Sequence, residues 1–190
     1  FTMKDFVTLP DVPYVMNQGF SDCVKLKRFK CESFDYRESP NAGDFQLFRF
    51  ANCVLLEECD FGELRGRVNA TPHAMFENTP VAASCVPACI TRIGTQTYAN
   101  CAHLRVVVFE GALETIGLRM FDGCVSVTVI FKSLVPPKKL EYAGMNNVTA
   151  IYVPDAAVSA YKSGVLSGLA AIISPLSGYS GYMPTKLYEI

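Results

Sequence analysis

Tryptophan is absent from this 190-residue chain, histidine occurs only twice, and charged residues make up 18% of the sequence. The formal net charge of −1 leaves no basic excess for binding nucleic acid and no polyanionic tail. No apolar run approaches the roughly eighteen residues that a membrane-spanning helix needs. We therefore expect no nucleic-acid partner and no membrane span, and the length suits one domain with a sizeable core.

The motifs of common enzyme classes are also missing. The chain has no phosphate-binding P-loop and no dinucleotide-binding fingerprint. Residues 177–181 lack the spacing of a nucleophile elbow, and the neighbouring acids Glu57 and Glu58 suit a solvated surface better than a glycosidase site. The sequence thus predicts a protein that is not an enzyme, with no catalytic residue, cofactor or metal.

The chain does contain an internal repeat. An aromatic residue, which we call the anchor, is followed three positions later by Cys or a substitute, and then by two further apolar residues at the same spacing. The anchors are Phe20, Phe50, Phe76, Tyr98, Phe121 and Tyr142, and the residues three positions after them are Cys23, Cys53, Thr79, Cys101, Cys124 and Met145. Anchors lie 21 to 23 residues apart in the second half and farther apart in the first, where we expect inserted loops. Such co-registered recurrence predicts stacked structural repeats.

Each repeat predicts two pieces of local structure. Apolar residues at i, i+3 and i+6 occupy one side of a short helical or 3-10 turn. The next segment, such as residues 104–109, is rich in β-branched residues and predicts a short strand. One unit cannot bury its apolar face alone, so the strands of stacked units should form a parallel sheet.

The domain organisation follows from the extent of the repeats. We expect about six to seven repeats in residues 1–176, with a partial first repeat in residues 1–19. Residues 177–190 then form a C-terminal tail, which either docks on the repeats or leads to a further region. The start at Phe1 suits a piece of a longer protein.

Two stretches carry a family resemblance. The run from Cys85 to Gly94 and the run from Tyr98 to Leu104 resemble the BspA-like leucine-rich repeat of bacterial surface proteins, and residues 151–162 with 173–176 are similar to the segment that closes many members. The resemblance covers residues 7–176, although the first half lacks the Ile-Gly element before Phe50 and Phe76. It implies an α/β-type, right-handed solenoid, an extracellular or cell-surface location, an adhesive or recognition role, and no catalytic residues.

Cysteine is abundant, with eight residues. Cys23, Cys53, Cys101 and Cys124 share one repeat position, so they should form an inward ladder, and Cys31, Cys59 and Cys85 fall at strand positions that we also expect to point inward. Stacked equivalents have parallel Cβ vectors, which suit a disulfide badly, so we expect buried free thiols and no more than one disulfide. Cys89 should be exposed. A zinc site using Cys85, Cys89 and a histidine is the weaker alternative, because the spacing is wrong for a structural site.

The outward side chains of the strands are the candidate binding residues. Counting five and seven residues from the Cys position gives Arg28 and Lys30, Glu58 and Asp60, Ser84 and Val86, Val106 and Val108, Val129 and Phe131, and Ala150 and Tyr152. The first two pairs are charged. A shift of one residue in the fifth repeat is an alternative, because Lys132 would otherwise point inward.

The apolar outward residues predict a covered surface. Val106, Val108, Val129, Phe131 and Tyr152 should form one patch, which a soluble monomer normally avoids exposing. A ligand, the tail, or a second copy in a homodimer through the sheet face could cover it. The sequence predicts a non-catalytic recognition or adhesion module of a secreted or cell-surface protein, binding a protein or glycan through this face. The alternative is a structural or self-assembling repeat segment of a larger protein.

Overall fold

Parallel strands from successive repeats dominate the structure. The computed structural model describes residues 6–9, 19–31, 33–35, 49–60, 63–65 and 69–190. Its strands are β1 (Phe6–Leu9), β2 (Arg28–Cys31), β3 (Ser33–Asp35), β4 (Glu58–Asp60), β5 (Glu63–Arg65), β6 (Ala83–Val86), β7 (Val106–Phe109), β8 (Thr115–Ile116), β9 (Val127–Phe131), β10 (Lys139–Leu140), β11 (Val148–Val153) and β12 (Ile173–Pro175).

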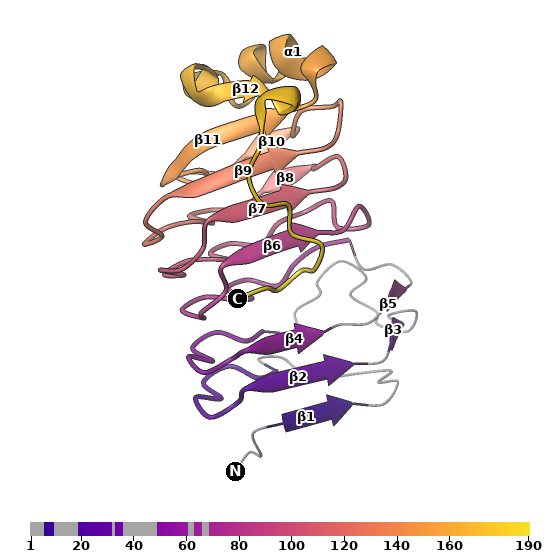
Figure 1. The fold of residues 1–190 in the computed structure, drawn as a ribbon, viewed down its shortest axis with the longest axis vertical. Coiled ribbons are helices and arrows are strands. Elements are labelled where there is room, and N and C mark those ends of the chain that lie inside the picture. The colour runs from indigo at the N-terminus through magenta and orange to yellow at the C-terminus, as the bar shows by residue number, and fades with distance from the viewer. Residues whose placement is uncertain (1–5, 10–18, 32, 36–48, 61–62, 66–68) are drawn as a thin grey trace.

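The strands lie in four sheets, and every pairing between these strands is parallel. The larger sheets have the orders β1-β2-β4 and β12-β11-β9-β7-β6. The small pair β3-β5 lies to the side of β2 and β4, and the small pair β10-β8 lies behind the longer sheet (Figure 1). The strand order follows the chain within each large sheet, so the predicted repeat fold with a parallel sheet is confirmed. The two large sheets are separate: β4 and β6 do not pair.

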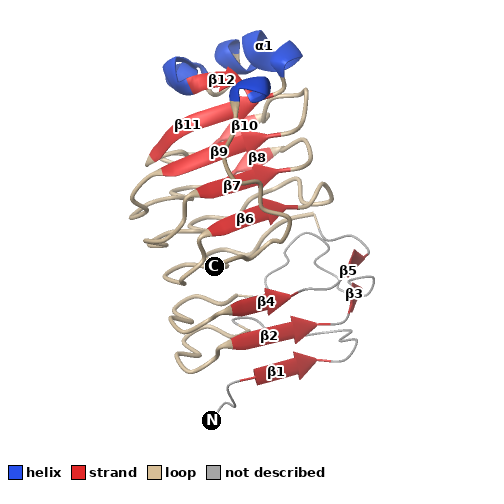
Figure 2. Cartoon of the chain, viewed as in Figure 1, coloured by secondary structure: helices blue, strands red, loops and turns tan. Residues whose placement is uncertain are grey.

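Helices gather at one end of the stack (Figure 2). They are the 3-10 helices η1 (Asp155–Ala157), η2 (Ser167–Ile172) and η3 (Leu176–Gly178) and the α-helix α1 (Val158–Ser163). Tyr161 of α1 is buried, its ring packs on Phe131, and its hydroxyl donates to the carbonyl oxygens of Ser133 and Val135. This segment covers the core that the last repeat would otherwise expose.

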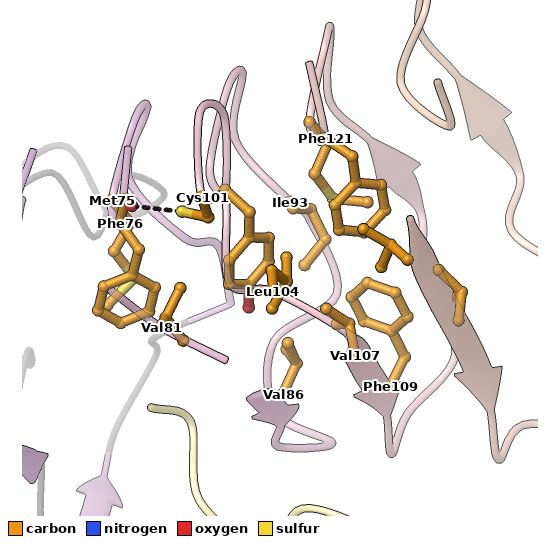
Figure 3. Close-up of a cluster of buried hydrophobic side chains, with 14 of the residues drawn as sticks. Met75, Phe76, Val81, Val86, Ile93, Cys101, Leu104, Val107, Phe109 and Phe121 are labelled. Carbon is orange, nitrogen blue, oxygen red and sulfur yellow. Dashed lines mark hydrogen bonds between the residues drawn. The ribbon is translucent and has the colours of Figure 1, made fainter. Parts of the chain in front are cut away.

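The aromatic anchors form a continuous stack inside the repeats. Phe50, Phe76, Tyr98 and Phe121 have no exposed surface, and Phe20 is also buried. Ring centroids are 5.2 Å apart for Phe20 and Phe50, 6.1 Å for Phe50 and Phe76, and 5.9 Å for both Phe76 with Tyr98 and Tyr98 with Phe121. Aromatic pairs at these separations contribute beyond their buried area. Figure 3 shows Phe76 and Phe121 among the other core side chains.

The turns between anchor and strand are not the predicted helical or 3-10 turns. The residue two positions after each of the first five anchors has a positive φ, between 52° and 74°, and so has Asn147 in the last repeat; the five residues are Asp22, Asn52, Asn78, Asn100 and Gly123. A left-handed residue interrupts a helix, and Asn, Asp and Gly adopt this conformation most readily. Asn78 donates to the side chain of Asn52, and Asn52 to that of Asp22, so neighbouring turns are also linked. The Asx residue after the anchor was the sequence signal for this turn.

The left-handed residue also corrects the last anchor. Because Asn147 has this conformation, Met145 occupies the anchor position, and Met145 is buried while Tyr142 is 76% exposed. The prediction of Tyr142 as an anchor was therefore wrong. The last repeat is also shorter between anchor and strand, since Val148, three residues after Met145, pairs with Val127, six residues after Phe121.

The ladder cysteines have a polar role as well as an apolar one. Cys53, Cys101 and Cys124 are buried, and each thiol donates to the carbonyl oxygen of the anchor one repeat earlier, which is Phe20, Phe76 or Tyr98, at 3.1, 2.9 and 3.1 Å (Figure 3 shows the bond of Cys101). Asn147 makes the same bond to Phe121 through its side-chain amide, at 3.0 Å. Because both groups donate a hydrogen bond to the same kind of carbonyl oxygen, the amide of Asn147 can replace the cysteine thiol in the last repeat.

The seven described cysteines, all but Cys31, are free. Cys59 is buried in the main core as predicted, Cys23 is half-buried, and Cys89 is exposed as predicted. Cys31 lies outside the residues whose side chains the structure describes. Burial raises the pKa of the Cys53 and Cys101 thiols to about 12 and that of Cys124 to about 11.

Thiol reactivity should reflect this arrangement. Because a thiolate is the nucleophile and burial disfavours it, we expect Cys89 to react first with a thiol reagent, and the buried ladder cysteines Cys53, Cys101 and Cys124 to react only on unfolding. After denaturation without reductant, all eight cysteines of the sequence should react. Recovery of only two to four reactive thiols from the denatured chain would show disulfides and contradict this result.

The same thiols should make stability fall at alkaline pH. The pKa values of these thiols are raised in the folded chain. Their contribution to the free energy of unfolding is therefore complete below the ordinary thiol pKa of 9.0, and it is lost as pH rises toward 11 and 12. Urea melts at pH 8 and pH 10.5 measure this loss. A Cys101→Ser variant replaces the thiol by a hydroxyl donor that ionises much less readily, so its free energy of unfolding should fall less between the two pH values.

Candidate interaction surface

The strand register separates the two faces of the sheet β12-β11-β9-β7-β6. Val86, Val107, Phe109, Val129 and Phe131 belong to the main core between the layers. A second apolar cluster lies on the opposite side of the sheet, which we call the outer face, and contains Ala83, Cys85, Val106, Val108 and Ile130. The pairing Ala83–Val106–Thr128–Ala150 and the pairing Cys85–Val108–Ile130–Tyr152 define its two rows.

Three of the five predicted site residues lie on the outer face. Val106 and Val108 are there and buried, and Tyr152 packs beside them. Val129 and Phe131 point into the core instead, so the prediction was wrong for both, and Thr128 and Ile130 take their places. The reason is loop length: Val106 is five residues after Cys101, whereas Thr128 is four residues after Cys124. The position of Lys132, which is exposed and bonded to Glu110 at 2.6 Å, was the sequence signal for this shift.

The third repeat has the same shift. Ala83 and Cys85 point outward, while Val86 packs in the core and the Ser84 hydroxyl lies 2.7 Å from the hydroxyl of buried Tyr98. The outward prediction for Ser84 and Val86 and the inward prediction for Cys85 were therefore wrong. Cys85 instead donates to the Glu110 carboxylate at 3.6 Å.

The chain's own C-terminal segment covers this apolar part of the outer face. Leu176, Tyr179 and Met183 pack against the outer cluster, and the rings of Tyr179 and Tyr152 lie 4.8 Å apart. In Figure 1 this segment, drawn in yellow, runs over the strands from β12 toward β6. The cover explains why all four residues of β6 and of β7 are buried.

The end of the segment pairs with β6 as an antiparallel neighbour. Glu189 forms an antiparallel bridge with Ala83, and the backbone N–H of Cys85 donates to the carbonyl of Lys186 at 2.7 Å. Burial raises the pKa of Glu189, but hydrogen bonds from Tyr182 and from the backbone of Thr185 and Lys186 outweigh it and lower the pKa. The carboxylate thus fastens the turn that precedes the bridge.

The N-terminal part of the outer face carries charges and remains open. Arg28, Lys30 and Glu58 are exposed and Asp60 is half-buried, as expected for outward positions. Arg28 is paired in register with Glu58, and Lys30 with Asp60. A cleft of about 500 Å³ lies between these strands and the tail, and its lining includes Arg28, Glu58, Asp60, Tyr182, Lys186 and Glu189.

The other sequence candidates do not combine into a chemical site. His103 is exposed as predicted. Within the described residues, no three His, Cys, Asp or Glu side chains are grouped so that they could hold a metal ion. Among the described residues, no helix has the length and apolar character that crossing a membrane requires.

Comparison with known proteins identifies the repeats. The family model described as a BspA type leucine-rich repeat region matches residues 39–142, in six copies. The match begins after the first anchor, Phe20, and ends before Met145. No curated protein matches the sequence.

Proposed function

The chain belongs to the BspA-type leucine-rich repeat family, and on this basis we propose that it is a non-catalytic recognition module of a secreted or cell-surface protein. The family is generally non-catalytic and typically surface-associated or secreted in bacteria. The proposal includes a right-handed solenoid as the scaffold and a protein as the partner, bound through the outer face.

The open charged part of the outer face carries this proposal. Val106 and Val108 are already covered by the tail, so a partner reaches Arg28, Lys30, Glu58 and Asp60 first. The two residues on β2 are positively charged and the two on β4 are negatively charged, and the two strands lie beside the cleft. Complementary charges give a protein interface its specificity and its association rate, and rigid strands hold them in fixed positions.

A binding screen with matched charge variants tests the proposal. The full chain is screened against extracellular-matrix proteins and a glycan array, and each binder is measured again with Glu58→Lys. We expect a protein binder whose Kd rises at least about tenfold, because a like-charge contact replaces an attractive one.

Glu114→Lys is the matched control. It makes the same change of charge at an exposed residue beside Lys138, next to β8 and away from the outer face. Binding that survives Glu58→Lys unchanged, or that Glu114→Lys weakens equally, would contradict the proposed surface. Binding of glycans alone would replace the protein partner by a carbohydrate.

A further inference from the structure

The gap between the two large sheets is filled by residues far away in the sequence. β4 and β6 do not pair, and the edge of β6 instead bonds to the tail. The N–H of Ala83 donates to the carbonyl of Glu189 at 3.1 Å, and the N–H of Glu189 returns a bond to Ala83 at 3.0 Å. In Figure 1 the C-terminus lies between β6 and β4. The body of the protein thus presents a slot that accepts an extended strand by backbone pairing.

The slot also recognises side chains. Leu187 and Tyr188 are buried, at 8% and 3% exposure, and both belong to the main core. The Tyr188 hydroxyl donates to the Leu56 carbonyl at 2.7 Å, and its ring lies 5.1 Å from that of Phe76. The Ser84 hydroxyl donates to the Leu187 carbonyl at 2.6 Å. Tyr188 therefore touches repeats on both sides of the gap, and the slot is selective for this segment.

The chain crosses to the slot through the exposed residues Ser180, Gly181 and Tyr182. Beyond this crossing, Met183 packs against the outer cluster and Pro184 is buried. The slot contacts come from the segment that follows this crossing, so they do not require that the segment belong to the same chain. Exchange of an identical element between copies is a low-cost route to a dimer.

We propose that residues 182–190 of one copy fill the slot between β4 and β6 of a second copy, and that the reciprocal exchange forms a dimer. The contacts are the same in both forms, so chain entropy and concentration decide between them. A short tether gives the tail an effective concentration in the millimolar range, so exchange should become measurable as the protein approaches about 1 mM. The proposal concerns the filled slot and is independent of a partner on the open outer face.

Sedimentation of the unmodified full chain is the first test. From about 10 µM to about 1 mM we expect a monomer to become increasingly dimeric, over the range that the tether sets. Tyr188→Asp should remain monomeric throughout, because a carboxylate is excluded from the buried slot. Tyr142→Asp is the matched control at an exposed tyrosine and should dimerise like the unmodified chain. A chain that stays monomeric at 1 mM, or a dimer that persists in Tyr188→Asp, would overturn the proposal.

Disulfide trapping is the second test. Two full-length variants, Ala83→Cys and Glu189→Cys, are mixed, and residues paired in this way lie about 5.5 Å apart at Cα, within disulfide range. We expect a covalent dimer in which mass spectrometry of peptides finds residue 83 of one chain linked to residue 189 of the other. The variant Ala102→Cys, at an exposed position outside the slot, replaces Ala83→Cys in the control and should give only the background from Cys89. Equal yields from the two mixtures, together with an intrachain bond in the doubly substituted chain, would exclude exchange.

Discussion

Replacing Phe121 by alanine is expected to lower the free energy of unfolding by about 3–5 kcal/mol, the range for large core truncations. The Phe121 side chain has no exposed surface and stacks on Tyr98 at 5.9 Å, so its loss leaves a cavity that the neighbouring repeats cannot fill without moving. Urea denaturation, followed by circular dichroism, measures the change.

Tyr142→Ala provides the matched control, because this tyrosine was expected to be an anchor and is 76% exposed. Its removal should change the free energy of unfolding by no more than about 0.5 kcal/mol, as for other surface substitutions. Met145→Ala should instead cost about 2–5 kcal/mol, since Met145 occupies the anchor position and is buried. Equal effects at Tyr142 and Phe121 would contradict the register of the last repeat.

Removing residues 177–190 should have the largest effect of any change considered. The deletion uncovers the outer apolar cluster and takes Leu187 and Tyr188 out of the main core. Two buried side chains of this size contribute about 2–5 kcal/mol each, so the loss should exceed that of Phe121→Ala. The truncated chain should also bind a hydrophobic dye such as ANS, which the full chain should not.

Single substitutions keep this prediction testable if the truncated chain does not fold. Tyr188→Ala should lose about 3–5 kcal/mol, and Tyr188→Phe only about 1 kcal/mol, because the second variant keeps the ring and loses the hydrogen bond to Leu56. Tyr182→Ala, at a residue 63% exposed, should have little effect on stability. An unchanged melting curve for Tyr188→Ala would show that the tail is not part of the fold.

The repeat architecture was predictable because it follows from local and periodic features. The anchors and ladder cysteines recur in the sequence, and stacking places equivalent residues over one another, so Phe50, Tyr98 and Cys101 are buried as expected. The Asx turns were not recognised, although Asn52 and Asn100 carry their signal two residues after an anchor. The error at Tyr142 arose because an aromatic residue matched the pattern three positions before the buried methionine.

The outer face was harder to predict because it depends on single-residue differences and on distant contacts. A loop one residue shorter in the third and fifth repeats moves the outward positions from Val129 to Thr128 and Ile130, since strand side chains alternate. The pairing of Glu189 with Ala83 and the bond from Tyr188 to Leu56 join segments more than a hundred residues apart. Repeat periodicity contains no information about such contacts. The apolar composition of the tail indicated only that it was one of three candidates for the cover.

Amide hydrogen exchange at Glu189 tests most directly the claim that the tail is an integral strand of the repeat stack. Its N–H donates to the Ala83 carbonyl at 3.0 Å, so we predict that it exchanges as slowly as the amides of β7, at a rate set by unfolding of the whole stack. Exchange of Glu189 at the rate of an unstructured peptide, while the β7 amides remain protected, would contradict the account.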